Sequence, residues 1–261
     1  MRDALARSAA RLGPFGHRMH WLETTSSTND VAAHLAELGA NEGTIVAADA
    51  QTAGRGRLGR SWFSPPGAGL YVSIVLRPSG DLSKTVNPSA LLTLASGVAI
   101  AEGVAASTGL PVEIKWPNDV MIGKRKLAGI LAEATAQAGS LQQVILGFGL
   151  NLHPAAFPPE LADRVTSIEA ETSRPADRAQ IVVEILAAFA ARYADLRGGR
   201  FDAILSAWRR LAPSLASALV EWDVPGGVVR GRAEGIDDAG RLLVRVDGRL
   251  ERLIAGEVRW I

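Results

Sequence analysis

The amino-acid sequence predicts an α+β domain followed by a small all-β module. Between residues 26 and 211, short apolar runs typical of buried strands are interspersed with longer segments of helical periodicity. Past Pro213 the pattern changes to short alternating segments separated by glycine- and aspartate-containing turns, which is typical of hairpins. We therefore expect an N-terminal extension over residues 1–20, a larger domain over residues 21–213 and a C-terminal module over residues 214–261.

The larger domain begins with a helix expected over residues 26–39. Ser27 stands at the N-cap position and Asp30 follows three residues later, which together predict a capping box. The buried face of this helix would be formed by Val31, Leu35 and Leu38. The later elements are expected as strands over 44–48, 70–77, 112–116, 126–133 and 142–150, and as helices over 87–107, 178–196 and 201–211.

The composition excludes several classes of protein. With 48% hydrophobic residues among 261, the chain is too apolar to be disordered, and its formal net charge of +1 favours neither nucleic acid nor a membrane surface as partner. The absence of cysteine excludes disulfides and thiolate metal sites, and the four histidines form no metal-ligand spacing. Because no leader and no run of about 18 apolar residues are present, we expect a cytoplasmic protein without a membrane partner or a protein-bound metal.

A long loop is expected over residues 49–69, and it carries the first candidate motif. Arg55, Arg57 and Arg60 alternate there with glycines, and residues 51–60 contain no acid. Glycines let backbone N–H groups approach a ligand closely, and arginines supply fixed charge and forked donors. The segment therefore predicts a binding loop for a small polyanion. A solvated basic turn and an RNA-binding Arg-Gly segment are the alternatives.

A second motif consists of Lys115-Trp-Pro-Asn-Asp119 followed by Lys124-Arg-Lys126-Leu-Ala-Gly129. Proline ends the strand after Trp116, and a hairpin would then bring Asp119 and Lys126 close together. A surface ion pair beside an Asx turn is the simpler interpretation of the same residues.

Two shorter motifs could complete a site. Alternate glycines in Gly147-Phe-Gly-Leu-Asn151 would leave one face of a sheet bare, so that a flat ligand could lie against it. Ser26-Ser-Thr-Asn29 would place hydroxyls and backbone donors at a helix N-terminus. Close packing of a helix against the strand explains the alternate glycines equally well. Capping of the helix N-terminus explains the hydroxyls of the Ser26–Asn29 motif.

Together and in this order, these motifs resemble those of the biotin protein ligase (biotin–acetyl-CoA-carboxylase ligase) family. The resemblance extends over residues 20–261. Some members carry an N-terminal winged helix-turn-helix that represses transcription, and the residues before position 21 are too few for one. The chain therefore resembles the monofunctional type, with no DNA partner. The motifs are Ser27-Thr-Asn29, Gln51-Thr-Ala-Gly-Arg-Gly-Arg57, Gly59-Arg60-Ser-Trp62, Lys115-Trp-Pro-Asn-Asp119, Arg125-Lys-Leu-Ala-Gly-Ile-Leu131 and Gly147-Phe-Gly-Leu-Asn151.

The resemblance implies an α+β fold like that of class II aminoacyl-tRNA synthetases, with a central mixed β-sheet flanked by helices and a C-terminal Src-homology-3-like barrel. It also implies that biotin and ATP, with Mg²⁺, give biotinyl-5′-AMP, from which biotin passes to one lysine of the biotin carboxyl carrier protein of acetyl-CoA carboxylase. The enzyme would act as a monomer or homodimer. The alternative on the same fold is a lipoate or octanoate ligase or transferase.

The resemblance assigns roles to residues of this chain. The catalytic groups would be Lys126, Asp119, Arg55 and Arg57. Biotin would be bound by Ser27, Thr28, Asn29, Gln51, Arg55, Gly56, Arg57, Lys126, Gly129, Gly147 and Gly149. ATP would be bound by Arg57, Arg60, Trp62, Asn118, Lys126 and Asn151.

The chemistry explains why such residues are needed. In the first step a carboxylate attacks a phosphate, so fixed cations must bring two anions together. In the second step the acceptor is a lysine amine with a pKa of ~10.4, of which only about four in ten thousand are neutral at pH 7. Asp119 would serve as a base or as an orienting group. A mobile Gly-Arg loop would shield the adenylate from water.

Overall fold

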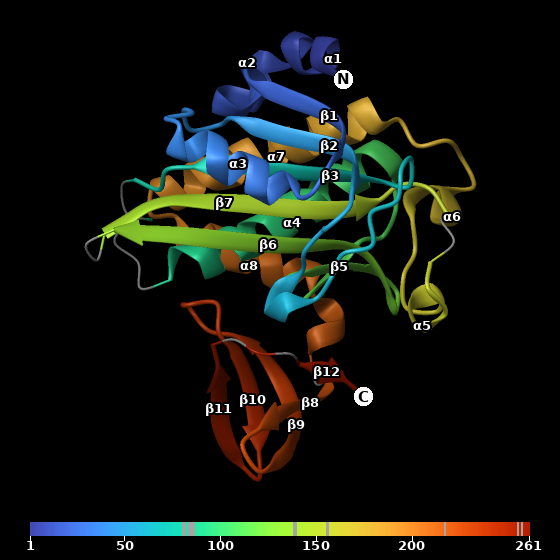
Figure 1. Ribbon diagram of the computed structural model, residues 1–261. Helices are drawn as coiled ribbons and strands as arrows, with labels where there is room; N and C mark the ends of the chain where they lie inside the picture. The colour runs from blue at the N-terminus through green and yellow to red at the C-terminus, as the bar shows by residue number, and fades with distance from the viewer. Residues whose placement is uncertain are drawn as a thin grey trace.

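The computed structural model describes residues 1–79, 82, 87–137, 140–154, 157–216, 218–254, 256 and 258–261 (Figure 1). Two β-sheets organise the chain. The larger sheet has seven strands in the order β1-β2-β3-β7-β6-β5-β4, and the C-terminal sheet has five in the order β11-β10-β9-β8-β12. The prediction of an α+β domain followed by an all-β module is confirmed.

The larger sheet is mixed, as expected. Of its described strand pairs, β1 with β2 is parallel and the others are antiparallel. Long β7 lies near the middle, between β3 and β6, and carries the alternate glycines. The strands are β1 (Met19–Thr25), β2 (Ile45–Gln51), β3 (Gly69–Leu76), β4 (Glu113–Lys115), β5 (Asp119–Ile122), β6 (Arg125–Gln137) and β7 (Ser140–Asn151).

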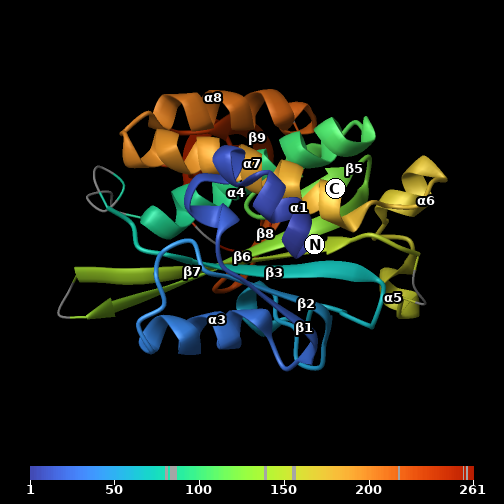
Figure 2. The same ribbon diagram turned by 90° about the horizontal axis from the view of Figure 1, so that it is seen from above.

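Helices cover both faces of this sheet (Figure 2). On one face lies α3 (Thr28–Glu37), and on the other lies α4 (Pro88–Thr108) with α7 (Arg178–Arg197) and α8 (Phe201–Leu211) outside it. The shorter helices are α1 (Arg2–Arg7), α2 (Ala9–Leu12), α5 (Pro159–Ala162), α6 (Ile168–Thr172) and the 3₁₀ turns η1 (Gly13–Gly16), η2 (Arg57–Gly59) and η4 (Pro213–Leu215).

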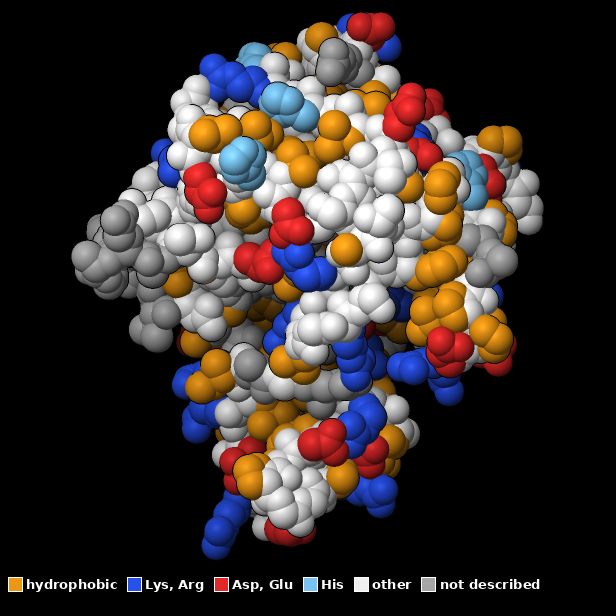
Figure 3. Space-filling model, in the orientation of Figure 1, with side chains coloured by type: hydrophobic (Ala, Val, Ile, Leu, Met, Phe, Trp, Pro, Cys, Tyr) orange, Lys and Arg blue, Asp and Glu red, His pale blue; other side chains and the backbone are white. Residues whose placement is uncertain are grey.

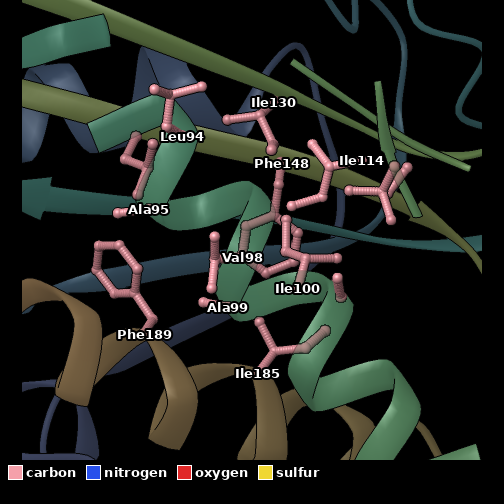
Figure 4. Close-up of a cluster of buried hydrophobic side chains, with 14 of the residues drawn as sticks. Leu94, Ala95, Val98, Ala99, Ile100, Ile114, Ile130, Phe148, Ile185 and Phe189 are labelled. Carbon is pink, nitrogen blue, oxygen red and sulfur yellow. The ribbon is translucent and has the colours of Figure 1, made fainter. Parts of the chain in front are cut away.

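Helix α4 forms the centre of the core. It is the one helix of the described chain that is long and apolar enough to cross a membrane, and most of it is buried between the sheet and α7. Figure 4 shows its side chains between Ile130 and Phe148 of the sheet and Ile185 and Phe189 of α7. A Cβ at Gly103 would lie 2.5 Å from the backbone nitrogen of Ile185, so glycine permits this close helix contact.

Helix α3 begins where the sequence places it, and Val31 and Leu35 pack against the core as partly buried residues, but the centre of its buried face is formed by alanines. Ala32 and Ala36 pack against the sheet, whereas Leu38 is the C-cap residue and is 72% exposed. The small alanines allow the helix to lie close to β2, β3 and β7, so the predicted buried position of Leu38 is wrong. The capping box is wrong as well, because among the described residues the Ser27 side chain makes no capping bond and Asp30 pairs with Arg55 instead.

The N-terminal residues contribute to the same core. Leu5, Leu12 and Phe15 are buried, and the Phe15 ring packs against Phe189 and Tyr193 with centroid separations of 5.1 and 5.8 Å. These contacts fix the first turns of the chain against α7.

The C-terminal sheet lies below β5 in Figure 1, and at the seam between the two sheets its buried apolar side chains join the core of the larger domain. The indole Nε1 of Trp116 donates to the backbone oxygen of Gly240 at 3.0 Å, and the ammonium of Lys115 lies 5.2 Å from the Trp260 ring centre. The second motif is thus attached to the module. The strands are β8 (Leu219–Val224), β9 (Gly227–Ile236), β10 (Leu242–Val246), β11 (Arg249–Leu253) and β12 (Arg259–Trp260).

Candidate active site

A cavity of about 1020 Å³ lies between the larger sheet and the C-terminal module. It brings together residues from β2, α3, the Gly-Arg loop, β5, β6, β7 and β12, which are far apart in sequence. Every residue that the sequence analysis assigns to catalysis, biotin or ATP lines this cavity. The four motifs therefore form one site.

The buried end of the cavity is built around the N-terminus of α3. The backbone N–H and the hydroxyl of Thr28 both donate to Oε1 of Gln51, at 2.8 and 3.1 Å. Nε2 of Gln51 donates to Oγ of Ser64 at 3.2 Å, so both ends of this amide are fixed. Ser27 and Thr28 are buried, and the first turn of a helix offers backbone donors to a polar ligand.

Asn29 is held from three sides at this end. Its Oδ1 accepts a hydrogen bond from Ser73 Oγ at 2.6 Å, and its Nδ2 donates to Glu133 Oε2 at 2.5 Å. On the third side lies Gly147, where a Cβ would come within 2.2 Å of Asn29 Oδ1. Position 147 must remain glycine for Asn29 to keep this orientation, so close packing explains this glycine.

The Gly-Arg loop, residues 52–61, folds back on itself as it leaves β2. Its stem is closed by a bridge between Arg55 and Ser61 and by a hydrogen bond from Gly56 N to Arg60 O at 2.6 Å. At the tip, Leu58 has a φ of 57° and a side chain that is 70% exposed. A leucine in the left-handed region is unfavourable, so the tip is a strained and solvated part of the loop.

Two arginines of the loop have different partners. The Arg55 guanidinium forms a forked ion pair with Asp30, and the hydrogen bond to Asp30 raises the pKa of Arg55 above its ordinary value. Nη1 of Arg57 donates to Asn118 Oδ1 at 3.3 Å, and burial lowers the pKa of Arg57. Arg57 is therefore the more buried cation and faces the second motif.

The second motif forms two hairpins instead of one, because a strand that was not expected, β5, begins at Asp119 and pairs with both β4 and β6. Nζ of Lys126 lies 2.6 Å from Oδ1 of Asp119, which confirms that the turn brings these side chains together. Asn118 precedes Asp119 directly, and its side chain is tied to the strand that carries Lys126: its Nδ2 donates to the backbone oxygen of Ile130 in β6 at 2.8 Å. Lys126 and Asp119 are both more than two-thirds shielded from solvent, so this pair is held more firmly than an ordinary surface ion pair.

Trp62 lies across the bare face of the sheet. Cβ atoms built at Gly129 and Gly149 would lie 2.8 and 2.3 Å from its indole, so these two glycines make room for the ring. The Lys126 ammonium lies 5.1 Å from the centre of the indole. Within the described part of the chain the buried Nε1 of Trp62 has no hydrogen-bond partner.

The end of β7 is tied to the segment that precedes α6. Nδ2 of Asn151 donates to the backbone oxygen of Thr166 at 2.9 Å, and Thr166 N donates to Lys126 O at the same distance. Asn151 and Lys126 are therefore fixed relative to each other. The C-terminal module closes this side of the cavity with Leu219, Arg259 and Trp260.

Four residues of the site were not found from the sequence. Ser73, Glu133 and Ser64 hold Asn29 and Gln51, and Asp30 holds Arg55. One signal could have found Ser73, which is the one serine inside the apolar run of residues 70–76 and is fully buried. The others carry no local signal.

The cavity has two chemically different ends. Neutral amide and hydroxyl groups line the buried end, whereas cationic side chains surround the open one, and Figure 3 shows Lys and Arg gathered around the hollow above the C-terminal module. Such an arrangement can bind an uncharged polar ring at one end and stabilise phosphate at the other.

Comparison with known proteins decides the family. The Biotin/lipoate A/B protein ligase family matches residues 21–151, and the Biotin protein ligase C terminal domain matches residues 222–259. The chain belongs to this ligase family. Both matched segments contribute to the cavity described above.

Relatives of this ligase are similar over most of their length. The bifunctional ligase/repressor BirA of Bacillus spizizenii is 36% identical over 260 residues, covering 97% of this chain and 78% of that protein. The biotin–[acetyl-CoA-carboxylase] ligase of Paracoccus denitrificans is 34% identical, with coverage of 91% and 98%. The structure of the Aquifex aeolicus biotin protein ligase in complex with biotin and ATP superimposes with a TM-score of 0.80 at 27% identity, covering 94% and 99%.

Proposed function

We propose that this ligase activates biotin with ATP to biotinyl-5′-AMP and transfers the biotinyl group to a lysine of the biotin carboxyl carrier protein of acetyl-CoA carboxylase. The observation that carries the proposal is the placement of Lys126 and Arg57 in the same cavity as the buried Ser27–Gln51 polar end. The names of the relatives and the biotin and ATP of the Aquifex aeolicus complex support it.

The buried end is suited to the ureido ring of biotin. Thr28, Asn29 and Gln51 are held by hydrogen bonds to their neighbours before any ligand arrives. Preorganised donors and acceptors lose little freedom on binding, so they discriminate well against a ligand that lacks matching groups. Lipoate has no ureido ring, and we therefore assign biotin rather than lipoate to this end.

The cationic side of the cavity performs the first step. Lys126 and Arg57 place fixed positive charge where the biotin carboxylate must approach the α-phosphate of ATP. They reduce the repulsion between these anions and stabilise the charge that develops on the phosphate oxygens. No general base is needed, because the attacking carboxylate is already ionised.

Asp119 acts in the second step as an orienting group. Its carboxylate is engaged by Lys126 at 2.6 Å, which holds it at the cavity wall. An incoming lysine ammonium would be attracted to this carboxylate and positioned for loss of its proton and attack on the mixed anhydride. The amine nitrogen then bonds to the biotinyl carbonyl carbon as the C–O bond of the anhydride breaks, AMP leaves with the electrons of that bond, and the two protons lost by the ammonium pass to solvent.

Mg²⁺ would enter the site with ATP. Among the residues that the structure describes, no three His, Asp or Glu side chains are grouped to hold a metal ion. Mg²⁺ keeps several waters and commonly binds through substrate phosphates, so the ion would shield the pyrophosphate during the first step.

The proposed function gives each part of the chain a role. Residues 21–213 would form the catalytic domain, and residues 214–261 would close the nucleotide side of the cavity. We propose a cytoplasmic enzyme with a carrier protein as its macromolecular partner.

The direct test is incubation with biotin, ATP, Mg²⁺ and a carrier domain, followed by mass measurement of that domain. The expected result is addition of one biotinyl group that depends on ATP, and lipoate in place of biotin should give no product. Addition of lipoyl, or failure to form any activated ester, contradicts the proposal.

A further inference from the structure

Arg55 belongs to the cationic loop, yet its charge is already satisfied by the protein. Its Nη1 and Nη2 lie 2.9 and 2.6 Å from the two carboxylate oxygens of Asp30, a forked geometry. Nη2 also lies 3.6 Å from Oε2 of Glu133. Two carboxylates therefore face one guanidinium, which makes Arg55 a better anchor for the loop than a ligand for another anion.

The anchor is attached to the most rigid part of the site. Asp30 stands in the first turn of α3, directly after Asn29, and the positive end of the helix dipole stabilises a carboxylate there. Glu133 lies on β6, and the same Oε2 that faces Arg55 accepts the hydrogen bond from Asn29. A single network thus joins the loop to the buried polar end.

The position of Arg55 in the loop makes this contact effective. Arg55 forms the bridge to Ser61 that closes the stem, so fixing its side chain fixes both strands of the stem. The backbone contact from Trp62 N to Gly54 O lies directly behind it. Only the tip around Leu58 is then left to move.

We propose that Asp30, assisted by Glu133, is a positioning residue that holds the stem of loop 52–61 against α3 through Arg55 and thereby sets how long biotinyl-adenylate remains shielded. The inference rests on the proposed function for the adenylate. The pair itself is partly exposed, with side-chain exposures of 39% for Arg55 and 48% for Asp30. Its loss should therefore change rates about three- to tenfold, because a forked ion pair is stronger than an ordinary exposed pair.

The first test needs no ligand. Trypsin cleaves after arginine, and Arg57 and Arg60 lie in the loop. Asp30→Asn removes the charge and keeps the shape, and it should accelerate cleavage of the loop about three- to tenfold. Asp30→Glu keeps the charge and should restore most of the protection. Glu184→Gln is the matched control, because Glu184 forms a forked pair with Arg11 at 3.0 and 2.7 Å outside the site.

The second test follows the intermediate. Enzyme loaded with biotin and ATP is isolated, and the release of biotinyl-AMP is measured at low and high salt. In the original enzyme release should become faster as salt rises, since salt screens the exposed pair. In Asp30→Asn release should be about three- to tenfold faster at low salt and should rise less steeply with salt, since only the contacts of the phosphate with Arg57 and Lys126 are then left to screen. The rate of adenylate formation at saturating substrates should change less than the release rate.

The outcomes separate this proposal from the proposed function. If the original enzyme forms no biotinyl-AMP but Asp30→Asn exposes the loop to trypsin, the proposed function fails and the anchoring contact stands. If biotinyl-AMP forms and Asp30→Asn equals the original enzyme in both cleavage and release, the positioning role is overturned. A drop in melting temperature with unchanged cleavage and release also overturns it, because that result indicates a structural role alone.

Discussion

The buried end and the open end of the cavity solve different problems. At the buried end, Thr28, Asn29 and Gln51 are fixed by neutral hydrogen bonds, and Gly147 leaves no spare space. At the open end, Arg57 and Lys126 are cations held by the side chains of Asn118 and Asp119, beside a loop with a strained tip. Under the proposed function, the ring would be recognised by neutral groups that are fixed before it binds, whereas the chemistry would depend on charged side chains at the cavity wall.

The largest effect should come from removing the central charges of the open end. Lys126→Ala or Asp119→Ala should lower turnover by about a hundredfold or more, since preorganised electrostatic groups contribute on this scale. Adenylate formation and carrier biotinylation are measured separately, and the melting temperature should change little.

Arg174→Ala is the control for this prediction, because Arg174 is an exposed cation that does not line the cavity. Near-normal formation and transfer of the adenylate by both Lys126→Ala and Asp119→Ala would show that the catalytic assignment is wrong.

The role of the buried end in binding biotin can be tested by adding one methyl group at position 147. Gly147→Ala forces Asn29 to move, and it should raise the KM for biotin about 5- to 150-fold, which corresponds to about 1–3 kcal/mol from disrupted buried hydrogen bonds. The KM for ATP should change much less, and initial rates with each substrate varied separately give both values.

Gly103→Ala is the converse control. Its new methyl would press on the backbone of Ile185 in the core, so it should lower the free energy of unfolding by about 1–3 kcal/mol and leave the KM for biotin unchanged. If both glycine variants affect biotin binding alike, the buried end is not a separate recognition unit.

A smaller effect is expected when biotin and ATP bind and protect the Gly-Arg loop from proteolysis. Biotin with ATP should slow tryptic cleavage within residues 52–61 several-fold, because a bound adenylate gives Arg57 an anionic partner. Digestion is followed by mass spectrometry of the fragments. An unchanged cleavage rate in the loaded enzyme would count against its function as a lid.

The smallest effect concerns the two tyrosines, which lie behind the site. Burial raises the pKa of Tyr71 to about 12, and burial also raises the pKa of Tyr193. The unfolded chain releases these protons near pH 10, so stability should be complete below pH 10 and fall as the pH rises toward 12. Absorbance of the folded protein at the phenolate band should stay flat to about pH 11; an earlier rise would show that the core around Tyr71 is open.

Much of the fold was predictable because its signals are local. The apolar run of residues 70–76 and the periodicity of residues 178–196 correctly indicated β3 and α7. Strand β1 was missed because it lies at the sheet edge and is mostly half-exposed, so its residues follow no apolar alternation. The apolar face of α3 was only partly predicted, because Val31 and Leu35 pack against the core but the alanines beside them form its buried centre and Leu38 is exposed.

The site was predictable where one turn makes the contact. Asp119 and Lys126 are joined by the single hairpin of β5 and β6, whose turn is the short Gly123-Lys124 pair. Asp30 and Arg55 are 25 residues apart, and their pairing depends on how the loop folds back from β2 toward α3. Charge alone does not identify the partner of Arg55 over such a distance, because any of the 27 Asp and Glu residues could pair with it.

The indole of Trp116 and the carbonyl of Gly240 join the larger domain to the C-terminal module through a buried hydrogen bond, and a Cβ at position 240 would strike Leu94 of α4. A chain that ended before η4 would lack Gly240. The indole N–H of Trp116 would then have lost its hydrogen-bond acceptor, and the Leu94 side chain would have lost its contact with the C-terminal module. Two separately expressed pieces would have to re-form this seam before either could work. Dividing the enzyme there would make a reporter whose signal depends on reassembly of the pieces.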